Sequence, residues 1–143
     1  MATKSEVKDA IYTFFSDGLT IVYPVNAIPT AYPNTEFTAP AKSRWLSIIA
    51  SFADAGQESL GEVGSRKFIR SGSINVLVST PLLTNTTDSD DISENIQNIF
   101  EGNQITLTDD CIIFRNARTI DIGPNGEFYL ASVSVDFEYR VIK

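Results

Sequence analysis

The chain has no histidine and a single cysteine, Cys111, among its 143 residues. Without histidine, Ser-His-Asp and Cys-His catalytic arrangements are excluded, and so are zinc sites built from Cys and His. One cysteine cannot form an internal disulfide, and its apolar neighbours in "DDCIIF" predict a small buried side chain in a protein that folds in a reducing compartment. The composition therefore indicates a protein that is not an enzyme and holds no metal or other cofactor.

Long apolar runs and basic residues are also scarce. No stretch of about 20 apolar residues is present, so no membrane-spanning helix is expected. The N-terminal "MATKSEVKDAIYTFF" mixes charged and apolar residues, which is typical of an amphipathic helix and not of a signal peptide. Only 11 Lys and Arg face 18 Asp and Glu, which gives a formal net charge of −7. This balance opposes binding to a phosphate backbone, so DNA is expected to pass such a protein without specific binding.

Two segments have the periodicity of helices. Apolar residues in "VKDAIYTFF" recur at helical spacing behind a Thr3–Glu6 capping box, and Gly18 is expected to end this helix. A short strand is expected next, in "LTIVYPV". The second helix is predicted in "TNTTDSDDISENIQNIFEG", where a buried stripe is formed by Ile92, Ile96, Ile99 and Phe100.

The remaining patterned segments alternate as strands do. "RWLSIIASFADAG" and "SRKFIRSGSINVLVSTPL" are joined by a Gly-containing loop, which predicts a long hairpin that could project beyond the body of the domain. "CIIFRNARTI" and "EFYLASVSVDFEYRVI" flank the turn "GPNG", and the last of these strands is expected to be central or tightly paired. The order predicts an α+β fold, an antiparallel sheet with a long hairpin and two amphipathic helices, as a single domain over residues 1–143.

The proline-rich segment Asn26–Pro40 is too long for a simple turn, and long ordered loops often carry function. Its Tyr32 and Phe37, with Trp45 just beyond it, are candidate contacts between subunits. Packing of this loop onto its own core is an equal alternative for Tyr32 and Phe37.

Two charged clusters flank the long third strand. The basic cluster, at the start of this strand, consists of Arg66, Lys67 and Arg70. The acidic cluster, at the start of the second helix, consists of Asp88, Asp90 and Asp91. A solvated strand end and a complement to the helix dipole are the simplest explanations of the two clusters. The acidic cluster lacks the ligand spacing of a calcium loop, and no carboxylate pair is singled out for acid–base chemistry.

The order of these features resembles that of the small tail-terminator (tail-completion) proteins of long-tailed bacteriophages and related uncharacterised phage proteins. A "PN…FTAP" segment leads into "SRWLSIIASFADA", followed by "SLGEVGSRKFIRSGSINVLVSTPL", a helix ending in "NIFEG" and a closing "FYLASVSVDFEYRV". The most specific part is Leu60-Gly61 followed by Arg66, Arg70, Gly72 and a β-run that ends near Pro81. The resemblance covers nearly the whole chain. It departs after Pro81, where "LLTNTTDSDD" replaces a glycine-containing turn.

This resemblance implies a structural virion protein that caps the tail tube as a ring, ends tail polymerisation and forms the joint to the head and neck. It implies a homo-hexamer in the tail or neck of the virion, assembled in the host cytoplasm, with the tail tube protein and a neck or connector protein as partners and no membrane. The alternatives are a head–tail connector protein of the neck, a small-molecule-binding or carboxylate-based hydrolytic domain, and an adaptor that forms no ring.

A closed ring uses a head-to-tail interface, which requires two different complementary patches on each subunit. The basic cluster of one subunit is therefore a candidate partner for the acidic cluster of the next. The acidic cluster is also expected on the inner or end surface of the ring, where negative charge would keep passing DNA from adhering.

Overall fold

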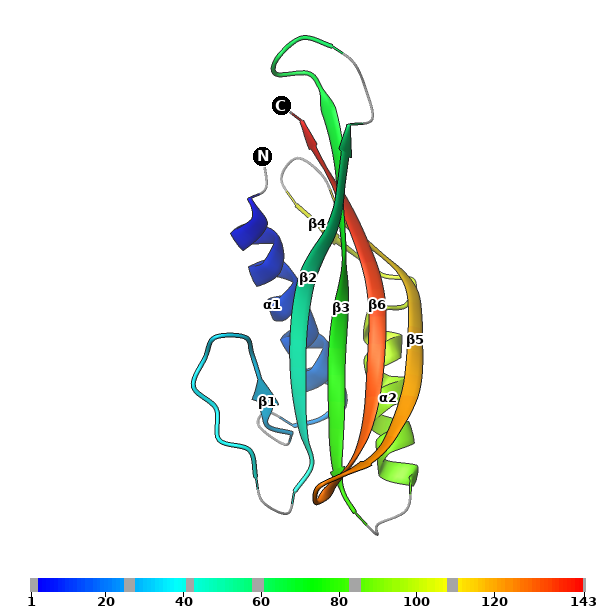
Figure 1. Ribbon diagram of the computed structural model, residues 1–143. Helices are drawn as coiled ribbons and strands as arrows, with labels where there is room; N and C mark the ends of the chain where they lie inside the picture. Colours follow the sequence, from blue (N-terminus) through cyan, green and yellow to red (C-terminus); the bar gives the residue numbers. More distant parts are fainter. Residues whose placement is uncertain are drawn as a thin grey trace.

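Both helices pack against the same face of one curled, six-stranded sheet (Figure 1). The elements of the computed structural model follow in the order α1 (Lys4–Val22), β1 (Thr30–Ala31), β2 (Trp45–Gln57), β3 (Lys67–Pro81), α2 (Thr87–Phe100), β4 (Gln104–Thr106), β5 (Cys111–Asn125) and β6 (Phe128–Ile142). The structure describes residues 3–24, 28–40, 43–57, 61–82, 86–107 and 111–142.

The strand order across the sheet is β1-β2-β3-β6-β5-β4, and every neighbouring pair is antiparallel except the short parallel pair β1–β2. Helix α1 contacts both β2 and β4, which lie toward opposite edges, so the sheet curls around this helix. The predicted α+β class and the long β2–β3 hairpin are confirmed. So is the central position of the last strand, because β6 lies between β3 and β5.

Helix α1 starts as the sequence predicts, with Glu6 N donating to Thr3 Oγ1 at 3.2 Å and Thr3 N donating to Glu6 Oε2 at 3.0 Å. Its predicted end at Gly18 is wrong, and so is the strand predicted in "LTIVYPV", because the helix continues to Val22. A Cβ on Gly18 would lie 2.7 Å from Ile99 Cγ2, so this glycine allows α1 and α2 to approach closely. Gly18 is a packing residue and not a stop signal.

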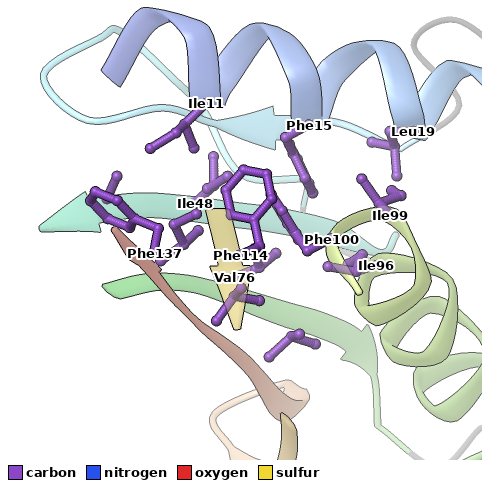
Figure 2. Close-up of a cluster of buried hydrophobic side chains, with 14 of the residues drawn as sticks. Ile11, Phe15, Leu19, Ile48, Val76, Ile96, Ile99, Phe100, Phe114 and Phe137 are labelled. Carbon is purple, nitrogen blue, oxygen red and sulfur yellow. The ribbon is translucent and has the colours of Figure 1, made fainter. Parts of the chain in front are cut away.

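The two hydrophobic stripes meet over the sheet in one core. Phe100 of α2 stacks on Phe15 of α1 at 6.0 Å between ring centroids and meets Phe114 of β5 edge-on at 5.0 Å. Figure 2 shows Phe15, Phe100 and Phe114 together above Val76 of the sheet. The predicted buried stripe of α2 is confirmed, since all four of its members are at most 9% exposed.

The second hairpin differs in detail from its prediction. Strand β5 continues through the expected turn to Asn125, and the reversal occurs at Gly126 and Glu127, where Gly126 has a φ of +63°. Cys111 is half-buried, not buried. Strands β1 and β4 were not predicted, because segments of two and three residues are too short for alternation to be visible.

Candidate assembly surfaces

Among the residues described, no group of three or more Cys, Asp or Glu side chains is placed to hold a metal ion. None of the helices in the described ranges is long and apolar enough to cross a membrane. The features that remain are surfaces: the hairpin tip, the two charged clusters, the aromatic loop and the uncovered side of the sheet.

The β2–β3 hairpin extends past the start of α1 (Figure 1). The described part of its connection is a turn in which Ser65 N donates to the Glu62 carbonyl at 3.0 Å and Gly64 has a φ of +98°. Arg66 Nε donates to the Gly61 carbonyl at 3.1 Å and ties the turn to the strand. Leu60, part of the motif that suggested the family, lies outside the described residues.

The basic cluster lies beside this tip, at the start of β3. Arg66 is half-buried and Lys67 is exposed. Arg70 points back onto its own subunit, with its guanidinium carbon 5.6 Å from the centre of the Phe68 ring. Burial raises the pKa of the nearby Tyr139 phenol above its usual value, and the charge of Arg70 partly opposes this rise. Arg70 therefore has a structural role within the subunit, whereas Lys67 is the more exposed member of the cluster.

Helix α1 contributes two further cations near the same end. Lys4 Nζ lies 5.2 Å and Lys8 Nζ 5.8 Å from the centre of the Phe52 ring. A cavity of about 300 Å³ opens here, lined by Lys4, Phe52, Ala53, Ala55, Arg70 and Tyr139. Lys4, Lys8, Arg66, Lys67 and Arg70 are thus gathered near this end of the hairpin.

The acidic cluster lies at the other end of β3. Asp88 Oδ1 accepts from Arg44 Nη1 at 2.9 Å, whereas Asp90 and Asp91 are exposed. The 15-residue strand Lys67–Pro81 separates the two clusters by about 45–50 Å, at about 3.4 Å per residue. Within one subunit the clusters therefore do not meet. Any pairing between them requires a second copy.

The aromatic residues of the loop before β2 pack onto their own chain. Tyr32 meets Tyr12 of α1 edge-on with ring centroids 5.8 Å apart. Phe37 lies 5.5 Å from Trp45, which in turn lies 6.3 Å from Phe128. These rings are half-buried, so the fold-back geometry is present. Contact between subunits stays a prediction for their exposed parts.

The open face, the side of the sheet away from the helices, was not singled out from the sequence. It is rich in small polar side chains on β2, β3 and β6, and Ser134 Oγ donates to Asn75 Oδ1 across the central strand pair at 2.8 Å. Ile49 and Ile120 are about half exposed on its outer strands. The serine-rich alternation opposite the apolar face could have indicated this surface.

Comparison with known proteins agrees with this architecture. A family model described as phage tail terminator protein matches residues 6–137. A solved structure matches with a TM-score of 0.77 and 17% sequence identity, covering 100% of this chain and 99% of that chain, and at this identity it shows the fold alone. The comparison with curated proteins finds no similar sequence. The resemblance expected from the order of the sequence features is confirmed by the family match.

Proposed function

The chain belongs to the phage tail terminator protein family, and we propose that it acts there as a ring that caps the tail tube, stops its polymerisation and forms the joint to the neck. Six subunits are the expected number. Membership itself makes the chain a structural, non-enzymatic component of a phage tail that associates with the tail tube. The predicted lack of catalysis is confirmed by this membership, and the hydrolytic alternative falls with it.

The observation that carries the ring is the difference between the two ends of the subunit. The end with the hairpin tip gathers Lys4, Lys8, Arg66, Lys67 and Arg70, whereas the other end carries the acidic cluster. Two unlike, complementary ends favour a head-to-tail interface, and such an interface closes when the rotation between copies divides a full turn. An antiparallel isologous dimer would pair the same two ends twice, so the number of copies measured in solution separates a dimer from a ring.

The acidic cluster has a second proposed role at the bore or the end of the ring. Exposed carboxylates at Asp90 and Asp91 give passing DNA no cations to bind, so no counterions are released and no affinity results. Asp88 contributes less, because Arg44 partly neutralises it. The neck or connector protein would then bind an end surface from which DNA is repelled.

Light scattering over a concentration series tests the ring. The expected result is a closed oligomer of about six copies, or a monomer that forms it on added tail tubes. A strict monomer with and without tubes would overturn the ring. Lys67→Glu should weaken assembly while leaving the fold intact, and Arg70→Glu is a poorer probe because Arg70 packs against Phe68 within the subunit. A ring that binds isolated neck complexes and ignores tail tubes would favour the connector alternative.

A further inference from the structure

A groove between α1 and α2 forms an apolar hollow on the helical side of the described molecule. It has a volume of about 500 Å³, and its apolar surface comes from Phe14, Gly18, Ile21, Val22 and Ile99. Ile21 is 86% exposed and Val22 48% exposed. Polar side chains form its rim: Asp17, Asn95, Asn98 and Asn103. Two large apolar side chains are therefore exposed to solvent beside a hollow that no described residue fills.

The groove is also electronegative. Both helices run toward it and end near it, α1 at Val22 and α2 at Phe100, and neither has a basic residue in its last turn. No cationic side chain of these last turns therefore offsets the negative ends of the two helix dipoles, and the Asn103 amide donates to the Ile99 carbonyl at 2.8 Å. The exposed carboxylate of Asp17 adds a full negative charge. An occupant with an apolar tip and flanking cations would match both properties.

The hairpin tip has this combination of properties. Val63 occupies the second position of the Glu62–Ser65 turn and is 84% exposed. The turn requires glycine at Gly64, where φ is positive, and makes no such demand at Val63. Because Val63 is 84% exposed, its side chain buries little apolar surface within the subunit. Arg66 and Lys67 follow immediately, and the hydrogen bond from Arg66 to Gly61 holds the turn in place. The tip is thus a preorganised turn that presents Val63 with the Glu62 carboxylate before it and the cations Arg66 and Lys67 after it, and its fixed geometry lowers the entropic cost of docking.

The tip cannot reach the groove of its own subunit. It lies beyond the start of α1, and about 20 Å of helix separates Lys4 from Gly18 at 1.5 Å per residue (Figure 1). We propose that Val63 of each subunit inserts into the α1–α2 groove of the next subunit, with Arg66 and Lys67 facing Asp17 and the two helix ends. The contact is heterologous, so it repeats around a ring and leaves no unmatched groove once the ring closes.

This contact deepens the proposed ring and rests on it. A four-residue turn is too small to hold two subunits by itself, since stable interfaces bury about 1,200–2,000 Å² in total. The knob therefore sets the register and direction of a larger interface. In this arrangement Arg66 and Lys67 face Asp17 of the next subunit, Arg70 keeps its packing on Phe68, and the acidic cluster keeps its proposed place at the bore or the end of the ring.

Site-directed cross-linking tests the contact. In a Cys111→Ser background, one preparation carries Val63→Cys and a second carries Ile21→Cys; they are mixed, assembled in solution or on tail tubes, and treated with a short bis-maleimide. The expected product is a covalent dimer that appears in the mixture and in neither preparation alone. The double variant should give a ladder up to the full ring. Ile120→Cys, another exposed apolar position on β5, replaces Ile21→Cys as the matched control and should give no product.

The outcomes separate this contact from the ring itself. A ring that forms without the Val63–Ile21 product, or with a Val63–Val63 product instead, overturns the contact and leaves the ring standing. If no ring forms in solution or on tubes, both fail.

Two further sets of variants measure the strength of the contact. Val63→Asp should weaken association about tenfold per interface, because it loses the burial of a valine and places a carboxylate beside Asp17. Ile120→Asp should leave association unchanged. In a charge exchange, Lys67→Glu and Asp17→Lys should each weaken association, and the double variant should recover part of the lost affinity. If the loss in the double variant equals the sum of the two single losses, the predicted pairing is contradicted.

Discussion

Val133 and Ser134 are neighbours on β6, yet they face opposite sides of the sheet. Val133 lies under the helices with 0% of its surface exposed, whereas Ser134 lies on the open face and donates to Asn75. The same alternation divides β2 and β3, so one face of the sheet is filled by the helices and the other carries none (Figure 1). The covered face explains why the chain folds, and the contacts proposed between subunits use other surfaces, the hairpin tip and the groove between α1 and α2.

Removing a side chain from the covered face should have the largest effect. Phe100→Ala should lower the free energy of unfolding by about 3–5 kcal/mol, because Phe100 contacts Phe14, Phe15 and Phe114 in the centre of the core. Ile120→Ala, on the open face, should change it by less than about 0.5 kcal/mol. Urea unfolding measures both, and similar losses for the two variants would contradict the division between the faces.

A glycine tests how tightly the long hairpin is packed against the covered face. A Cβ on Gly72 would collide with the Ser51 carbonyl oxygen and lie 2.9 Å from Phe137 Cζ, so Gly72→Ala should cost about 1–3 kcal/mol. Gly56→Ala is the control, because a Cβ there meets nothing within 4 Å. Thermal unfolding with no difference between these two variants would show that β2 and β3 adjust more freely than their register implies.

On the open face the expected effect is smaller. Ser134→Ala removes the 2.8 Å hydrogen bond to Asn75 and should cost about 0.5–1.5 kcal/mol. Val133→Ala, one residue away under the helices, should cost more because it leaves a cavity in a fully buried position. If chemical denaturation ranks the two the other way, the open face contributes more to folding than the comparison allows.

The smallest effect concerns alkaline pH. Burial raises the pKa of Tyr139 in the folded state, so the folded protein keeps the phenol proton more tightly than the unfolded chain does. The stability that this gives is fully present below about pH 10, the pKa of an unperturbed tyrosine, and is lost as pH rises through the folded-state value. In Tyr139→Phe, the free energy of unfolding should therefore fall less steeply than in the wild type as the pH rises above about pH 10. If the free energy of unfolding falls equally with pH in the two proteins, Tyr139 does not cause the loss of stability at alkaline pH.

The covered face could be predicted from the sequence more fully than the surfaces proposed for assembly, which are the hairpin tip, the charged clusters and the groove. The apolar stripes of α1 and α2 and the alternation of the long strands β3 and β6 repeat often enough to define both helices and the hairpins. Gly18 misled, because its role depends on Ile99, which is far along the chain, and no local pattern records that contact. Leu19 did carry a signal, since it extends the stripe of Val7, Ile11 and Phe15 by one more turn.

The surfaces depend on tertiary placement. The sequence predicts two charged clusters, but only the fold shows that they lie at opposite ends of β3 and that Arg44 already engages Asp88. Val63 in "GEVGS" gives no sign that it is exposed on the tip of a long hairpin, and the groove exists only where the ends of α1 and α2 come together. Residues of this kind become visible only when distant segments are assembled.

The most direct test of the capping role is elongation of tail tubes in the presence of the chain. Purified tube protein would be polymerised from preformed tail ends with and without the chain, and tube lengths would be measured by electron microscopy. The account predicts that the chain binds one end of each tube as a ring and that bound tubes stop growing. The Val63→Asp variant, if its free energy of unfolding matches that of the wild type, should cap fewer tubes. Tubes that elongate equally with and without the wild-type chain would contradict it.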